Sequence, residues 1–98
     1  MLYIIKELSL DKANRIILTR YFEGKIPKTV GIGYDPIKKE LIVQPYDESS
    51  GLTQYKVDDK NRISIPKWIT QKCGRDFYIV ADDTGKRSII PITNSDAF

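Results

Sequence analysis

The stretch YKVDDKNRISIP at residues 55–66 places an acidic turn between two segments that alternate apolar and polar residues. A similar stretch, LSLDKANRIILT, occurs at residues 8–19, with Asp, Asn, Arg and Ile at the same places 47 positions earlier. Such self-similarity indicates a chain built from copies of one unit. We therefore predict two repeats, residues 1–46 and 54–98, with the polar residues 47–53 as a connector.

The similarity continues further along the chain at the same offset of 47 residues. Residues 31–45 and 78–92 each read as a strand, a polar turn and a second strand. Each half has about 47 residues, close to the size of about 40 residues below which a lone domain rarely folds by packing alone. The single cysteine, Cys73, excludes an intramolecular disulfide. We expect both halves to share one core in a single domain, residues 1–98.

Local patterns predict a mainly β fold. Alternation and β-branched residues place strands at about residues 2–8, 15–19, 28–34, 40–44, 53–58, 62–66, 76–82 and 87–92. Residues 67–73 have room for two helical turns, with Pro66 at the start and Gly74 suited to the C-terminal cap. The matching part of the first repeat contains Gly24 and Pro27, which favour at most one irregular turn. The expected fold has one short helix per repeat, clearer in the second.

Composition excludes several function classes. The chain has 16 Lys+Arg against 13 Asp+Glu, a net charge of +3, which mildly favours polyanion binding. It has no histidine, the commonest general acid or base and the commonest zinc ligand. We expect no enzymatic activity, no metal and no cofactor. No apolar run reaches the roughly 18 residues of a membrane helix, so we expect a cytoplasmic protein with no membrane partner.

Three weaker signals favour structural roles. Gly31 and Gly33 lack the third glycine and the helix of a dinucleotide-binding loop, so they are interpreted as strand glycines. Residues 82–85, DDTG, fit a hairpin turn better than a cation loop. Without a histidine to activate it, Cys73 is expected to be a half-buried apolar residue.

The segment VDDKNRISIPKWI at residues 57–69, followed by strand, turn and strand, resembles the AbrB/MazE/MraZ superfamily. Units of that superfamily run as a strand, an acidic turn ending in Arg, an Ile-x-Ile-Pro strand and a short helix. The resemblance covers residues 55–92 well, and residues 8–45 look like a weaker copy with Thr19 where the other has Pro66. Two Asp-x-x-x-Arg units in one chain look most like MraZ. The resemblance implies a swapped-hairpin β-barrel formed within one chain as a pseudo-dimer.

The two turns depart from the family pattern at one position. The superfamily usually carries Gly before the Arg, whereas this chain has Asn14 and Asn61 there. Asparagine tolerates the left-handed backbone region better than most residues. The turn geometry can therefore survive with asparagine at both positions.

The resemblance also implies a function, the binding of double-stranded DNA by a transcriptional regulator. DNA is contacted in that superfamily from the turn and the first inner strand. These segments correspond here to Lys12, Arg15, Arg20, Lys60, Arg62 and Lys67. Lysines are expected to contact phosphate, whereas the planar arginine fork also fits the acceptor pair of guanine. Two equivalent units would match the dyad of a duplex.

Arg15 and Arg62 have a second interpretation. Each can pair with the aspartate four residues before it, Asp11 or Asp58, and brace its own turn. These carboxylates and Asp59 also place negative charge beside the proposed phosphate contacts, which lowers non-specific affinity for DNA. Bracing and DNA contact can coexist in the same side chain.

Other charged and aromatic residues are expected to have plain roles. The basic residues of the two distal hairpin turns are interpreted as solvated charge: Lys38, Lys39, Lys86 and Arg87. Tyr21, Phe22 and Trp68 follow the inner strands and are expected to cap the core rather than to stack on bases.

The near-balanced charge leaves a second function open, a protein-interaction or antitoxin-like module with a polypeptide partner. Residues 93–98 are too short for the acidic toxin-binding tail that MazE-like antitoxins usually carry. Because AbrB-like domains often multimerise, a homo-oligomer is also compatible with the resemblance.

Overall fold

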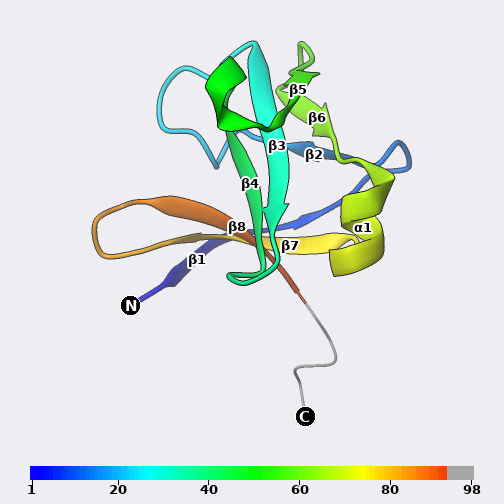
Figure 1. Ribbon diagram of the computed structural model, residues 1–98. Helices are drawn as coiled ribbons and strands as arrows, with labels where there is room; N and C mark the ends of the chain where they lie inside the picture. The colour runs from blue at the N-terminus through cyan, green and yellow to red at the C-terminus, as the bar shows by residue number, and fades with distance from the viewer. Residues whose placement is uncertain (93–98) are drawn as a thin grey trace.

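The computed structural model describes residues 1–92 of the chain (Figure 1). This part contains eight strands and one α-helix. The strands are β1 (Tyr3–Ser9), β2 (Arg15–Ile17), β3 (Thr29–Asp35), β4 (Glu40–Pro45), β5 (Thr53–Lys56), β6 (Arg62–Ser64), β7 (Asp76–Ala81) and β8 (Arg87–Pro91). A 3₁₀-helix, η1 (Glu48–Ser50), precedes β5, and the α-helix α1 (Lys67–Cys73) separates β6 from β7. The predicted mainly β fold is confirmed. β2, β5 and β6 each end two residues earlier than predicted.

The strands form two antiparallel sheets. Six strands pair in the order β1-β7-β8-β4-β3-β5, and β2 pairs with β6 in a separate two-stranded ribbon. β1, at the start of the chain, pairs with β7, while β5 pairs with β3. Strands distant in sequence therefore lie side by side, and β1 and β5 are the two end strands of the larger sheet.

Buried side chains from the strands and α1 form the core, in which Phe77 is the largest fully buried residue. Ile16 and Ile63 are Cα partners in the β2·β6 ribbon and are 2% and 1% exposed. Burying one such side chain contributes about 1.5–3 kcal/mol. From α1, Ile69 and Cys73 bury one face, and the Cys73 Sγ donates to the Ile69 carbonyl at 3.0 Å. Cys73 is 5% exposed within the hydrophobic core, which confirms its interpretation as an apolar residue, with more burial than expected. The same burial raises the pKa of the Cys73 thiol.

The helix forms where the sequence predicts it. Pro66 is the extended residue before α1, and Gly74 closes the helix with φ 82° while its N–H donates to the Thr70 carbonyl at 2.8 Å. The expectation of one short helix per repeat is wrong for the first half, where turns and bends occupy residues 19–25. Gly24 adopts a φ of 79° in this stretch, a conformation incompatible with an α-helix. Within residues 1–92, no helix has the length and apolar character needed to cross a membrane.

The glycines of β3 make room for one side chain. A Cβ placed on Gly31 or Gly33 would lie 2.9 Å or 2.6 Å from atoms of Leu52. Both glycines are buried within the strand, which confirms their role as strand glycines. The turn at residues 82–85 is also confirmed, because the Gly85 N–H donates to the Asp82 carbonyl at 3.0 Å.

Candidate nucleic-acid interface

The first acidic turn is closed by one carboxylate. The Asp11 Oδ1 accepts from the backbone N–H groups of Ala13 and Arg15, both at 2.9 Å, and the Asp11 Oδ2 accepts from the Arg15 Nε at 3.0 Å. The Asn14 N–H donates to the Asp11 carbonyl at 3.0 Å, and Asn14 has φ 60°. A short polar side chain that bonds its own turn is a common device for fixing a tight turn.

The second acidic turn has the same bonds 47 residues later. The Asp58 Oδ1 accepts from the N–H groups of Lys60 at 2.9 Å and Arg62 at 2.8 Å, while the Asp58 Oδ2 accepts from the Arg62 Nε at 2.9 Å. Asn61 has φ 62° and donates to the Asp58 carbonyl at 3.0 Å. Both asparagines therefore adopt the left-handed backbone region that this residue type tolerates.

The two turns also meet each other. The Arg15 Nη1 lies 4.0 Å from the Asp58 Oδ2, and the Arg62 Nη1 lies 4.0 Å from the Asp11 Oδ2. Two guanidinium groups and two carboxylates therefore form one cluster, called the Arg–Asp cluster below. Hydrogen bonds from the backbone N–H of the arginine are the largest cause that lowers the pKa of each aspartate. The bracing contacts expected for Arg15 and Arg62 are present.

The arginines lie on the outer face of the β2·β6 ribbon. The central residue of each strand is buried, so the residues on either side of it face outward. Arg15 is the Cα partner of Ser64, and Ile17 is the partner of Arg62, which places the arginines diagonally across the ribbon. Their side chains are 33% and 25% exposed, respectively. The outer face thus carries two positioned cations.

The other predicted DNA contacts surround this ribbon without joining the cluster. Lys12 and Lys60 are exposed in the two acidic turns. Arg20 is exposed in the irregular segment after β2, and Lys67 is exposed at the start of α1. None of these four side chains makes a hydrogen bond or ion pair within residues 1–92. The structure therefore brings together only Arg15 and Arg62 among the six predicted residues.

Arg75 braces the first turn from outside, a contact that sequence reasoning missed. Its Nη2 donates to the Asp11 carbonyl at 2.7 Å and its Nη1 donates to the Asn14 Oδ1. Lys28 holds the corresponding place beside the second turn. The backbone carbonyl of Arg75 accepts from the Leu10 N–H at 2.9 Å, and the backbone carbonyl of Lys28 accepts from the Val57 N–H at 2.9 Å. Leu10 and Val57 are the residues just before the two turns. A single charged residue in a loop carries no sequence pattern that could have revealed this role.

A cleft of about 470 Å³ lies beside the second turn. It is lined by Lys28, Thr29, Lys56, Val57, Asp58 and Asp59. Lys28 and Lys56 are both exposed, and neither amine forms an ion pair in the part of the chain that the structure describes. These two lysines add positive charge beside the second turn and are further candidate phosphate contacts.

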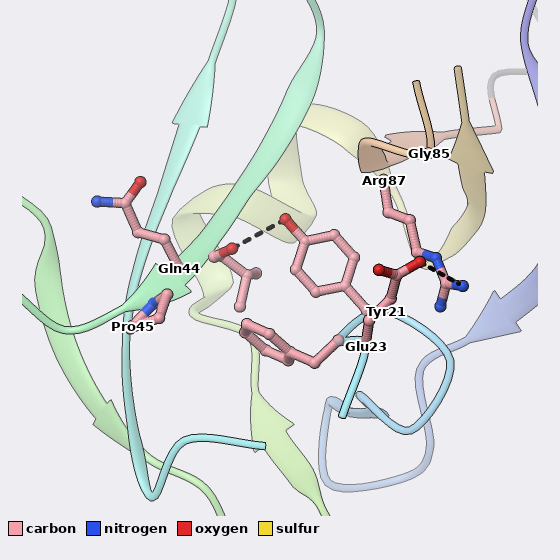
Figure 2. A pocket seen from close by; sticks show the side chains of 8 residues that line it. Tyr21, Glu23, Gln44, Pro45, Gly85 and Arg87 are labelled. Carbon is pink, nitrogen blue, oxygen red and sulfur yellow. Dashed lines mark hydrogen bonds and ion pairs between the residues drawn. The ribbon is translucent and has the colours of Figure 1, made fainter. Parts of the chain in front are cut away.

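Arg87 differs from its prediction as a solvated hairpin charge. Its Nη1 donates to the Arg20 carbonyl, and its Nη2 donates to the Glu23 Oε1 at 3.3 Å. Its Nε is buried and has no hydrogen-bond partner within residues 1–92. Figure 2 shows Arg87 beside Glu23 at a pocket that Tyr21 also lines. The volume of this pocket is about 320 Å³. Arg87 therefore ties the second hairpin to the irregular segment after β2.

The aromatic residues divide into two groups. Tyr21 and Phe22 pack against the core, and their two rings meet edge-to-face with centroids 5.0 Å apart. The Tyr21 hydroxyl donates to the Val43 carbonyl at 2.9 Å (Figure 2). Their predicted role as caps of the core is confirmed. Trp68 is 47% exposed, so the same prediction is wrong for Trp68.

Within residues 1–92, no group of three or more His, Cys, Asp or Glu side chains is arranged to hold a metal ion. Comparison of the chain with models of protein families, with curated proteins and with solved structures gave no match.

Proposed function

We propose that this chain binds double-stranded DNA through the outer face of the β2·β6 ribbon and acts as a transcriptional regulator. The observation that carries the proposal is the diagonal pair of arginines on an antiparallel two-stranded ribbon. A ribbon of this kind fits the major groove of B-DNA, and several DNA-binding folds use one.

The bracing contacts leave donors for a ligand. Arg15 and Arg62 each use Nε for their own aspartate. Within residues 1–92 their Nη groups make no hydrogen bond, and each Nη1 lies 4.0 Å from the aspartate of the other turn. A guanidinium held at one edge loses less side-chain entropy when its other edge binds. The open edge suits guanine O6 and N7 or a phosphate oxygen. Structural bracing thus orients both arginines for DNA.

Lysines around the ribbon would supply the phosphate contacts. Lys12 and Lys60 are exposed in the turns, and Lys28 and Lys56 flank the second turn. The exposed carboxylate of Asp59 opposes phosphate at the same place. Net attraction therefore rests on several lysines acting together. Each phosphate that is neutralised makes the slope of log affinity against log salt concentration more negative by about 0.9.

The proposal includes an AbrB-like architecture, a swapped-hairpin pseudo-dimer within one chain. Support comes from two strand pairings that correspond to each other across 47 residues. Ser9 pairs with Asp76, and the residues 47 positions away from them, Lys56 and Thr29, also pair with each other. The same shift interchanges the hydrogen bonds of the two acidic turns. The pseudo-dyad would then pass through the Ile16–Ile63 pair, and a duplex centred there would meet both arginines equivalently.

Fluorescence anisotropy with random duplex DNA and with DNA upstream of the chain's own gene tests this proposal. Arg62→Ala should weaken binding to a preferred sequence by about 1–3 kcal/mol if Arg62 reads a base. Lys60→Ala should weaken binding to all sequences alike and reduce the salt slope by about 1. Lys39→Ala, in the turn between β3 and β4, serves as the matched control and should change nothing.

Thermal melts of each variant separate loss of binding from loss of folding, because Arg62 also braces its turn. Failure of the folded wild-type protein to bind either duplex at low salt would overturn the proposal.

One observation favours a second candidate, a protein-interaction or antitoxin-like module. The Arg–Asp cluster balances its own charge, and Ile17 beside it is 38% exposed. A locally neutral face with an exposed aliphatic side chain is compatible with a polypeptide partner. Failure to bind DNA, together with specific capture of a polypeptide that Ile17→Lys abolishes, would establish this alternative.

A further inference from the structure

The strand pairs beside the two acidic turns differ in charge. Lys56 and Thr29 are Cα partners at one end of the β3·β5 pairing, next to the second turn. Ser9 and Asp76, the residues 47 positions away from them, are Cα partners next to the first turn. The Ser9 hydroxyl donates to the Asp76 Oδ1 at 2.7 Å. A hydroxyl and a carboxylate therefore stand beside the first turn, where an amine and a hydroxyl stand beside the second.

The cation next to each of these pairs also differs in its bonding. Beside the first turn, the Arg75 guanidinium donates to the Asp11 carbonyl at 2.7 Å and to the Asn14 Oδ1. Beside the second turn, Lys28 is exposed, and its ammonium makes no hydrogen bond or ion pair within residues 1–92. The first cation is used by the protein itself, whereas the second is open to a ligand.

The open cations of the second turn meet at the cleft of about 470 Å³. Lys28 and Lys56 both line this cleft. Of its two carboxylates, Asp58 accepts from the Arg62 Nε at 2.9 Å, which leaves Asp59 alone against the two lysines. The surplus of positive charge favours an anion. Because Asp58 belongs to the cleft and to the Arg–Asp cluster, the cleft adjoins the arginines of the β2·β6 ribbon.

We propose that Lys28 and Lys56 bind backbone phosphates of duplex DNA at this cleft, and that the first turn binds fewer phosphates than the second. The inference rests on the proposed function and adds an unequal hold on the two halves of the duplex. Lysine binds phosphate as a point charge. At the place of Lys56, the first half has Ser9 bonded to the carboxylate of Asp76, which repels phosphate.

The inequality concerns the phosphate contacts and leaves the two arginines alike. Arg15 and Arg62 have the same bracing bonds, so each can meet its half of the duplex in the same way. Phosphate contacts position a duplex without reading its sequence. The difference between the two halves should therefore appear in the salt dependence of binding, which counts neutralised phosphates.

Fluorescence anisotropy with one random duplex over a salt series tests the inference. The paired change Lys56→Ser with Thr29→Asp gives the second half the residues of the first. It should make the slope of log affinity against log salt concentration less negative by about 0.9, because one phosphate is no longer neutralised. Lys28→Ala should have an effect of the same size. Lys38→Glu, in the turn between β3 and β4, lowers the net charge as much as the paired change and should leave the slope unaltered.

The reciprocal change builds the site on the other half. Ser9→Lys with Asp76→Thr gives the first half the residues of the second, and it should make the slope more negative by about 0.9. Both residues are exposed, so the change leaves the core intact. Thermal melts of every variant separate loss of binding from loss of folding.

The outcomes distinguish this inference from the proposed function. A protein that binds DNA and loses affinity on Arg62→Ala, but keeps the wild-type slope after Lys28→Ala and after the paired change at Lys56 and Thr29, would overturn the inference alone. A reciprocal change at Ser9 and Asp76 without effect on the slope would also contradict it. Failure of the folded wild-type protein to bind any duplex at low salt would overturn the proposed function as well.

Discussion

The two acidic turns have the same internal hydrogen bonds, but among the described residues only the first is also hydrogen-bonded by a side chain from another part of the chain. Arg75 spans the first turn with two hydrogen bonds, whereas Lys28 at the corresponding place beside the second makes none with its side chain within residues 1–92 and borders a cleft. Local sequence therefore sets the geometry of each turn, since Asp, Asn and Arg recur at the same spacing. The external brace depends on one residue outside the repeated motif.

The segments that follow the two turns differ in the same way. After β6, Pro66 and Gly74 delimit α1. After β2, an irregular segment containing Gly24 is held by Tyr21 and by Arg87 from a distant hairpin. Where local signals for a helix are missing, long-range contacts fix the chain instead.

The largest expected effect tests whether the two halves of the ribbon are equivalent. Ile16→Ala and Ile63→Ala should each lower the free energy of unfolding by about 2–5 kcal/mol, because each removes a buried side chain from the core. The two losses should be similar, since these residues are Cα partners. Urea denaturation measures both, and a large inequality between them would break the equivalence.

A smaller effect should separate the two turns. Arg75→Ala should cost about 1 kcal/mol, because it removes two hydrogen bonds at an exposed site, whereas Lys28→Ala should be nearly neutral. Lys28→Arg should recover part of that amount by making on the second turn the contacts that Arg75 makes on the first. Thermal or urea unfolding compares the three variants, and a Lys28→Ala loss as large as that of Arg75→Ala would contradict the comparison.

The smallest expected effect concerns acid. Asp11 and Asp58 have pKa values lowered from the ordinary 3.8, chiefly by the backbone N–H groups of Arg15 and Arg62. A carboxylate with a lowered folded-state pKa contributes stability that is present above 3.8 and is lost as the pH falls through the folded-state pKa.

Asp11→Asn and Asp58→Asn should therefore each flatten the decline in stability below pH 3.8. Part of the decline in stability should remain in both variants, because the pKa values of Asp47 and Asp82 are also lowered. Unfolding free energies measured over an acid pH series check this prediction, and unchanged slopes in both variants would contradict it.

The sequence predicted the features that depend on neighbours along the chain. Alternation located the strands, and Pro66 and Gly74 located α1 to the residue. The turn motif indicated that its geometry could survive with asparagine before the arginine, and Asn14 and Asn61 have positive φ values. These features succeed because a strand, a helix cap or a tight turn is set by residues within one short window.

Features that depend on distant partners were not predictable. Arg87 looked like a solvated hairpin charge, yet its guanidinium donates to a carbonyl 67 residues away. Arg75 and Lys28 belong to no motif, although one braces a turn and the other borders a cleft. Of the six candidate DNA contacts, the structure joins only Arg15 and Arg62, through an Arg–Asp cluster that no single segment contains.

The most direct test of the central claim is an NMR titration of ¹⁵N-labelled protein with duplex DNA from upstream of its own gene. The proposed interface predicts that backbone amides of the β2·β6 ribbon and its turns, including Arg15, Lys60 and Arg62, shift first and most. The amide of Lys39 in the distal hairpin should remain unchanged. Shifts confined to other surfaces, or no shifts at low salt, would contradict the assignment of the ribbon as the DNA-binding face.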